Sequence, residues 1–206
     1  MAILASTVLS RVRTQLIDPA PGTHWTDEEL LQWMSDGQRT IVSAIPKATA
    51  TITTQALVAG SLQTIAAAGY MLLAVYRNVG GRAVYEVERA ILDRETPTWQ
   101  TQTSTAAVTA YFRDETDPRS FWVYPPNTGA GTVTLSYSAQ PAELTSSSDA
   151  LGVLDIYATP LFDYVMFRAH QKDNDYAAVQ AVSQQYLSNF SAFLASQSGF
   201  STPKGP

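Results

Sequence analysis

The stretch TATITTQALVAGSLQTI, residues 49–65, decides the fold because the hydrophobic period of the sequence changes there. Over residues 50–55, small or apolar side chains alternate with polar ones, and this alternation is typical of a β-strand. The Gly-Ser pair at 60–61 favours a turn, so residues 62–65 are expected to return as the hairpin partner of the first strand. The stretch therefore predicts β-structure in the middle of the chain.

Similar signals continue as far as residue 138. Further strand candidates are residues 72–79, 83–87, 108–113, 121–124 and 132–138. Glycine or proline pairs separate several of them, and Gly80-Gly81 is expected as a turn that takes a positive φ. Residues 87–94 can instead form a short helical turn before Pro97. About five to seven short strands predict a small antiparallel β-module, arranged as a sandwich or like a barrel.

A pair of helices is expected before this module, over residues 4–45. In the first helix, apolar residues recur at every fourth position, which places them on one face of the helix. They are Leu4, Val8, Val12 and Leu16. The Asp18-Pro19 pair should end this helix, because a residue before proline disfavours the helical conformation.

The second helix has the clearest start signal in the sequence. Thr26 is expected as its N-cap, and Glu29 three residues later completes a capping box. Trp25 and Leu30 stand at the positions of a hydrophobic staple across this start. Pro46 should end the helix, because proline within a helix removes a hydrogen bond and clashes with the preceding turn.

A second helical pair is expected after the module, over residues 154–197. Its first helix contains Pro160, which either kinks the opening turns or stands at the first helical position behind a Thr159 cap. Residues 172–175 form a short link to the last helix. That helix ends at Gly199, and the residues after it form an extended tail.

This order of elements predicts an α+β protein. A four-helix bundle is built from both chain ends, and a small antiparallel β-module is inserted between them. The 206 residues, 45% of them apolar, suffice for one core or for one core with a smaller second one. The expected parts are an N-terminal helix pair at 1–46, the β-module at 47–149, a C-terminal helix pair at 150–198 and an extended tail at 199–206.

The chain carries few charges. Only 15% of its residues are Asp, Glu, Lys or Arg, against about 25% in typical soluble domains. Surfaces that other subunits cover lose charge, so the composition indicates either a largely covered exterior or an uncharged β-surface. The net charge of −5 argues against a basic nucleic-acid-binding surface. The negative net charge is compatible with a protein that surrounds DNA without binding it tightly.

The sequence predicts no catalytic, cofactor-binding or metal site. Cysteine is absent, which excludes disulfides and thiolate ligands and is compatible with a reducing cytoplasm. His24 and His170 are far apart in sequence and lack the spacing of metal ligands. We expect no signal peptide, because Arg11 and Arg13 interrupt the apolar start. The long uncharged run between residues 47 and 77 is rich in threonine, which favours strands over a membrane span.

Acidic residues gather at two places, and both are interpreted as turns. The run DND at 173–175 lacks the glycine and the closing glutamate of a calcium loop, so helix capping is expected there. Asp114, Glu115 and Asp117 are expected as solvated residues at a hairpin tip.

Six aromatic residues of the module allow two interpretations. On one exposed strand face they would form a platform that stacks on sugars, whereas burial would make them core residues. Burial is favoured, because aromatic side chains are mostly buried in folded proteins. These residues are Trp99, Tyr111, Phe112, Phe121, Trp122 and Tyr124.

Three parts of the sequence carry a resemblance to a known family. They are WTDEEL at 25–30, FWVYPP at 121–126, and LDIYA at 154–158 with DYVM at 163–166, followed by Tyr186 and Phe190. In this order they resemble the opening helix pair, the β-hairpin and the C-terminal helical hairpin of the head-to-tail adaptor proteins of tailed bacteriophages. The three elements that contain these segments together span most of the chain.

The resemblance implies a structural, non-enzymatic neck component of a phage virion. Such a connector forms a ring, expected as a dodecamer, between the portal protein and a tail or nozzle protein. The ring continues the DNA channel, through which DNA passes without sequence-specific binding, and it is assembled in the host cytoplasm without a membrane. In several such families the C-terminus reaches into the portal. The tail is short here, and the resemblance implies partner binding by Phe200, Ser201, Thr202, Pro203 and Lys204.

A second interpretation stays open. The β-module would bind carbohydrate or protein and be carried on a helical stalk, as in a receptor-binding component of a tail. Sugar binding through the region of Trp99 or Trp122 would favour this interpretation, whereas capture of the portal protein would favour the adaptor.

Overall fold

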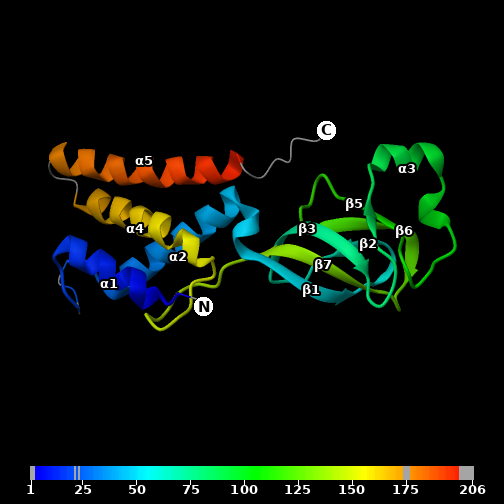
Figure 1. Cartoon of the computed structure of the whole chain (residues 1–206), viewed down its shortest axis with the longest axis horizontal. Helices are drawn as coiled ribbons and strands as arrows, with labels where there is room; N and C mark the ends of the chain where they lie inside the picture. Colours follow the sequence, from blue (N-terminus) through cyan, green and yellow to red (C-terminus); the bar gives the residue numbers. More distant parts are fainter. Residues whose placement is uncertain (1–2, 21, 23, 174–176, 200–206) are drawn as a thin grey trace. The chain divides into compact units, whose positions relative to one another are not determined.

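The computed structural model describes residues 3–20, 22, 24–173 and 177–199 (Figure 1). It combines helices with small sheets, so the predicted α+β class is confirmed. The chain forms two compact units. Residues 1–49 and 141–206 make up a helical unit, and residues 50–140 make up a β-unit.

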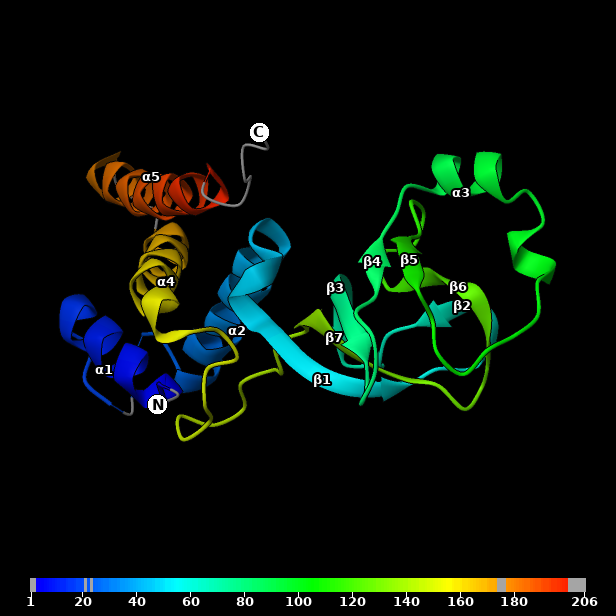
Figure 2. The ribbon, with the colours of Figure 1, turned by 45° about the vertical axis from the view of Figure 1, so that its right-hand side comes forward.

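The helical unit draws its long helices from both ends of the chain. These helices are α1 (Ala5–Leu16), α2 (Asp27–Ala44), α4 (Ala158–Lys172) and α5 (Ala177–Gly199), with short 3-10 turns η1 (Pro46–Thr49) and η3 (Asp155–Tyr157). Helix α4 contacts the other three, and Figure 2 shows it between α5 and α1. All four helices contribute to one hydrophobic core. Its buried residues include Val8, Val12, Leu30, Met34, Ile41, Leu161, Val165, Met166 and Phe190.

The start of α2 confirms the predicted capping box. Thr26 Oγ1 accepts a hydrogen bond of 3.2 Å from Glu29 N, and Glu29 Oε2 accepts one of 3.1 Å from Thr26 N. Trp25 and Leu30 are both buried in the core of the helical unit. Trp25 Nε1 also donates to Ala169 O at 3.4 Å, which connects this start to α4.

Helix α1 differs from the prediction at both ends. Leu4 is the residue before the helix and is 44% exposed, so it does not belong to the buried stripe. Ala5 and Leu9 are buried instead. The helix ends at Leu16, before the Asp-Pro pair, because Ile17 takes the left-handed conformation with φ of 55° and closes the last turn.

For Pro160, the expected first helical position behind a Thr159 cap is wrong. Helix α4 begins at Ala158, and Tyr157 is its N-cap. Pro160 is therefore the third helical residue. Its missing N–H costs nothing there, since the first N–H groups of a helix lack intrahelical acceptors.

The β-unit consists of two small sheets. Its strands are β1 (Ala50–Ala56), β2 (Ala59–Thr64), β3 (Gly69–Asn78), β4 (Tyr85–Glu86), β5 (Ala110–Arg113), β6 (Ser120–Thr128) and β7 (Thr132–Ala139), together with helix α3 (Arg89–Glu95) and the 3-10 turn η2 (Trp99–Thr101). One sheet has the order β1-β7-β3, and the other has the order β2-β6-β5-β4. Side chains of both sheets share a core, which includes Leu72, Val75, Tyr111, Phe121, Val123, Val133 and Leu135.

The expected hairpin of residues 50–55 with residues 62–65 is wrong. Strand β1 pairs with β7, and β2 pairs with β6 in the other sheet. Between them Leu57 is buried in the shared core, and the Gln63 amide bonds to both backbone groups of Val58. The chain thus crosses from one sheet to the other at this point instead of reversing within one.

The described strand pairs of the module are antiparallel, as predicted, except for one. Gly80 takes a positive φ of 68°, as predicted, and Ala83 then forms an antiparallel bridge with Arg77. The chain leaves that sheet at once, and β4 pairs with β5 in parallel. The two alternatives for residues 83–94 are therefore both realised in part, because helix α3 follows directly.

Candidate interaction surfaces

The residues that the sequence indicated for partner binding, Phe200, Ser201, Thr202, Pro203 and Lys204, lie outside the described residues. Candidate surfaces therefore come from the two units themselves. The helical unit contains a hollow, and the β-unit contains exposed apolar side chains.

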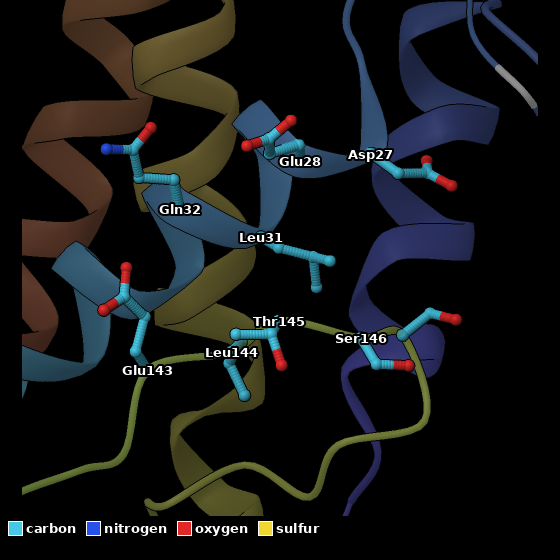
Figure 3. Close-up of a pocket in the computed structure, with 9 residues that line it drawn as sticks. Asp27, Glu28, Leu31, Gln32, Glu143, Leu144, Thr145 and Ser146 are labelled. Atoms are coloured by element: carbon cyan, nitrogen blue, oxygen red, sulfur yellow. The ribbon is translucent and has the colours of Figure 1, made fainter.

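The hollow of the helical unit has a volume of about 540 Å³ and lies between the start of α2 and the loop of residues 143–147. Its lining residues are Asp27, Glu28, Leu31, Gln32, Glu143, Leu144, Thr145, Ser146 and Ser147. Figure 3 shows carboxylates and hydroxyl groups around the side chain of Leu31. The hollow thus has a polar, acidic rim over an apolar floor.

Buried polar side chains of α2 hold the loop segment in place. Ser35 Oγ accepts a hydrogen bond of 2.9 Å from Leu144 N, and Gln38 Oε1 accepts one of 2.6 Å from Gly152 N. The Asp149 carboxylate closes the loop by accepting from two backbone N–H groups, which lowers the pKa of that carboxyl. The attachment of this segment to α2 was not predicted from the sequence.

A buried ion-pair network holds the corner between α1 and α2. Arg13 is only 5% exposed and contacts the carboxylates of Asp18, at 3.1 Å, and Asp27. Asp18 also accepts from the backbone N–H groups of His24 and Trp25. This network was not predicted from the sequence. The signal that could have revealed the network is the position of Arg13, four residues after the buried Leu9 and hence on the same helical face.

A second charged contact joins the two chain ends. Lys172 Nζ lies 2.8 Å from Glu29 Oε1 and also donates to His24 O at 3.1 Å. The hydrogen bond from Lys172 is the largest cause that lowers the pKa of Glu29. The end of α4 is thereby tied to the capping box of α2.

The two histidines make aromatic contacts. The His24 ring meets the Trp25 ring edge-on at a centroid distance of 4.4 Å, and the His170 ring stacks on Tyr186 at 5.8 Å. Burial lowers the pKa of His170. In the described part of the chain, no three His, Cys, Asp or Glu side chains gather closely enough to hold a metal ion. Residues 174 and 175 of the DND run lie outside that part.

The aromatic residues of the β-unit pack inward, which confirms the favoured interpretation. Tyr111 and Phe121 belong to the core between the sheets, and Trp99 packs with Phe112 and Trp122 in a smaller cluster. Trp99 is 2% exposed. The described residues therefore offer no exposed platform of these six rings.

The acidic hairpin tip is a tightly bonded turn, as predicted. Asp114 accepts from Trp122 Nε1 at 2.9 Å and from the N–H groups of Thr116 and Asp117, and these bonds lower its pKa. Asp117 accepts from Ser120 Oγ, which likewise lowers its pKa. The geometry fits a structural turn, because each carboxylate is already occupied by donors of its own loop.

Large apolar side chains are exposed in both units. The most exposed are Ile17 at 89%, Ile52 and Tyr85 at 66%, Val58 and Leu154 at 62%, and Ile156 at 60%. Scattered exposed side chains are common, so each needs its surroundings before it indicates an interface. Within the described ranges, every helix is too short or too polar to span a bilayer.

Comparison with protein families gives a match over nearly the whole chain. The family model described as SU10 adaptor protein matches residues 4–205, a range that includes both units. No curated protein matches the sequence.

Proposed function

We propose, from the premise that this chain belongs to the SU10 adaptor protein family, that it is a structural adaptor of a phage virion and not a catalyst. The single observation that carries this proposal is the extent of the family match, because it spans the helical unit and the β-unit together. A match to one unit alone would leave the other free for a separate role.

The finer proposal is a ring between the portal and the tail. Copies of the chain, expected to number twelve, would close by heterologous contacts in the neck of the virion and continue the DNA channel. Assembly would take place in the host cytoplasm. The low charged content supports covered surfaces, and the net charge of −5 suits a channel that lets DNA pass.

Each part of the chain has a proposed role in this ring. The helix pairs at 1–46 and 150–198 act as one four-helix bundle and form the scaffold. The β-module at 47–149 faces the tail or nozzle protein. The tail at 199–206, with residues 200–204, contacts the portal protein. The buried Arg13–Asp18 ion pair at the corner between α1 and α2, and the partly exposed Lys172–Glu29 pair between the two chain ends, support a rigid scaffold.

The alternative of a sugar-binding module has less support. Stacking on sugars requires exposed aromatic faces, and Trp99 and Phe112 are buried with Trp122 beside them. Binding of another protein by the β-unit is part of the adaptor proposal itself.

Electron microscopy of the protein mixed with purified portal tests the proposal. We expect rings of this protein on one face of the portal and no binding to a glycan array. A variant that ends at residue 199 tests the role of the tail and should bind the portal more weakly. Localisation of the chain in virions anywhere other than between portal and tail would refute the proposal.

A further inference from the structure

The β-unit covers the outer edge of strand β3. Strands β1 and β3 are the two edges of their sheet. Along β3, Val84 N donates to Tyr76 O at 3.0 Å, and Asn78 N donates to Arg82 O at 2.9 Å. The chain that follows β3 therefore occupies these backbone groups.

The edges of the other sheet have few free backbone groups with which an incoming strand could pair. The Gln55 side chain donates to Thr64 O at 2.8 Å and accepts from Ala66 N at 3.2 Å, so it occupies the end of β2. Strand β4 has only two residues. Among the described strands, β1 is thus the remaining candidate for a long free edge.

The backbone of β1 has an ordered row of outward groups. The strand pairs with β7 over an unbroken register of seven residues. Leu57 N, just after it, donates to Gly131 O at 2.9 Å, so residues at odd positions direct their backbone groups toward β7. Residues at even positions direct theirs to the free edge, where the described chain places no strand. The Thr54 carbonyl there accepts a long bond of 3.5 Å from the Thr53 hydroxyl.

The side chains of β1 leave this edge unprotected. Natural proteins protect edge strands with charges, prolines, bulges or very short strands. The sequence ATITTQA contains no charge and no proline, and its pairing with β7 has no bulge. Ile52 is 66% exposed and lies opposite Ser136 on the outer face of the sheet. Such an edge is a template for another strand.

We propose that two copies of this chain associate through antiparallel pairing of their β1 edges around a two-fold axis at Thr53. In this register Ala50 faces Ala56 of the second copy and Ile52 faces Thr54 of the second copy. In this register, each of the four residues whose backbone groups point to the free edge lies opposite such a residue of the second copy. The N–H group of one can therefore donate a hydrogen bond to the C=O group of the other. Neither strand carries a charged side chain that would repel the other. The contact forms in the free protein and does not rest on the proposed ring.

A cysteine variant tests the two-fold register directly. The chain has no cysteine, so any disulfide between two copies of a single-cysteine variant must join the two introduced residues. Thr53 would face its own copy in a pair without mutual backbone bonds, with Cα atoms about 4.5 Å apart, which suits a disulfide. We expect Thr53→Cys to form a disulfide-linked dimer on mild oxidation and Val79→Cys, at an exposed turn residue, to stay uncrosslinked. No crosslink at Thr53, or equal crosslinking of both variants, would overturn the proposal.

Sedimentation of the full chain gives the second test. We expect the wild-type protein to show a concentration-dependent dimer, and Ile52→Lys to weaken it about threefold or more, because the two lysines would be diagonal neighbours on one face of the new strand pair. Val79→Lys adds the same charge away from β1 and should dimerise normally. Circular dichroism confirms that each variant is folded. A wild-type protein that stays monomeric, or a dimer that Ile52→Lys leaves unchanged, would refute the pairing.

Discussion

Among the described residues, the helical unit buries charged side chains at one of its irregular segments, whereas the β-unit buries only neutral polar ones. At the corner between α1 and α2, the helical unit buries the charged residues Arg13 and Asp18. The buried polar side chains of the described β-unit are neutral, and three amides among them, Gln63, Asn78 and Asn127, bind the backbone of neighbouring loops. A buried ion pair fixes two elements through one strong contact, whereas a buried amide fixes one loop through several weaker ones. The two units should therefore respond differently to substitution and to pH.

The largest expected effect comes from Arg13. Arg13→Met leaves the buried Asp18 carboxylate without its charged partner, and we expect a loss of about 3 kcal/mol in the free energy of unfolding of the helical unit. Denaturant titration with hydrogen exchange, which reports each unit separately, measures it. Arg39→Met is the matched control, because the contact of Arg39 with Asp36 is exposed. Its loss should lower the free energy of unfolding by less than about 1 kcal/mol. Equal losses in both variants would contradict the role of the network.

The next largest loss of stability is expected when one of the buried amides of the β-unit is removed. Asn127→Ala removes the donors to Thr105 O, at 3.1 Å, and to Ala106 O, at 3.0 Å, and the acceptor for Gly129 N and Gly131 N. We expect the β-unit to lose about 2–4 kcal/mol, because unsatisfied buried groups cost about 1–3 kcal/mol each and water can reach some of them.

Hydrogen exchange checks where this loss occurs. Amides of the β-unit should exchange faster while those of the helical unit keep their rates. Asn189→Ala on the exposed side of α5 is the control and should change stability by less than about 0.5 kcal/mol. Faster exchange in both units after Asn127→Ala would mean that the units do not unfold separately.

A smaller effect is expected at the capping box. Thr26→Ala removes the acceptor for Glu29 N and should lower the free energy of unfolding of the helical unit by about 1 kcal/mol. Thermal unfolding followed by circular dichroism measures the change. Thr40→Ala, at an exposed position in the middle of α2, should not destabilise the helix. An unchanged melting temperature for Thr26→Ala would argue against the cap.

The smallest effect is a pH dependence at Glu29. Hydrogen bonds from Lys172 and Thr26 lower the pKa of this carboxyl in the folded protein. Its contribution is therefore present above the unfolded pKa of about 4.3 and is lost as the pH falls through the lower folded pKa. We expect Glu29→Gln to be less stable than wild type at pH 7, by less than about 1 kcal/mol, because the pair is partly exposed.

Denaturant titration at several pH values measures this difference. The stabilities of Glu29→Gln and wild type should converge at a pH below the folded pKa of Glu29. A difference that persists unchanged in acid would show that the charge is not its cause.

Local signals in the sequence predicted local structure. The capping box of α2, the positive φ at Gly80 and the strand at residues 72–79 each depend on side chains within a few residues of one another, and all three are present. The exposed Leu4 and the position of Pro160 in α4 differ from expectation. Helix ends depend on the capping geometry of single residues, here Ile17 and Tyr157, and apolar spacing does not encode that geometry.

The interaction surfaces were the least predictable part. The alternation in residues 50–55 places Ile52 and Thr53 on opposite faces, but a period of two does not say which face is buried. The apolar Ile52 points outward, because the neighbouring strand directs Val133 and Leu135 inward. The hollow beside α2 likewise needs residues 143–147, which come more than a hundred residues after that helix begins.

The sequence by itself determined the elements of this protein: helices at both ends, short strands between them, and the signals that start and turn them. Only the tertiary structure decided their partners. It placed β1 against β7, about eighty residues away, and Arg13 between two carboxylates. The physical reason is that propensity and capping act within one or two turns of chain, whereas pairing is chosen by the burial and hydrogen bonding that the whole fold can satisfy.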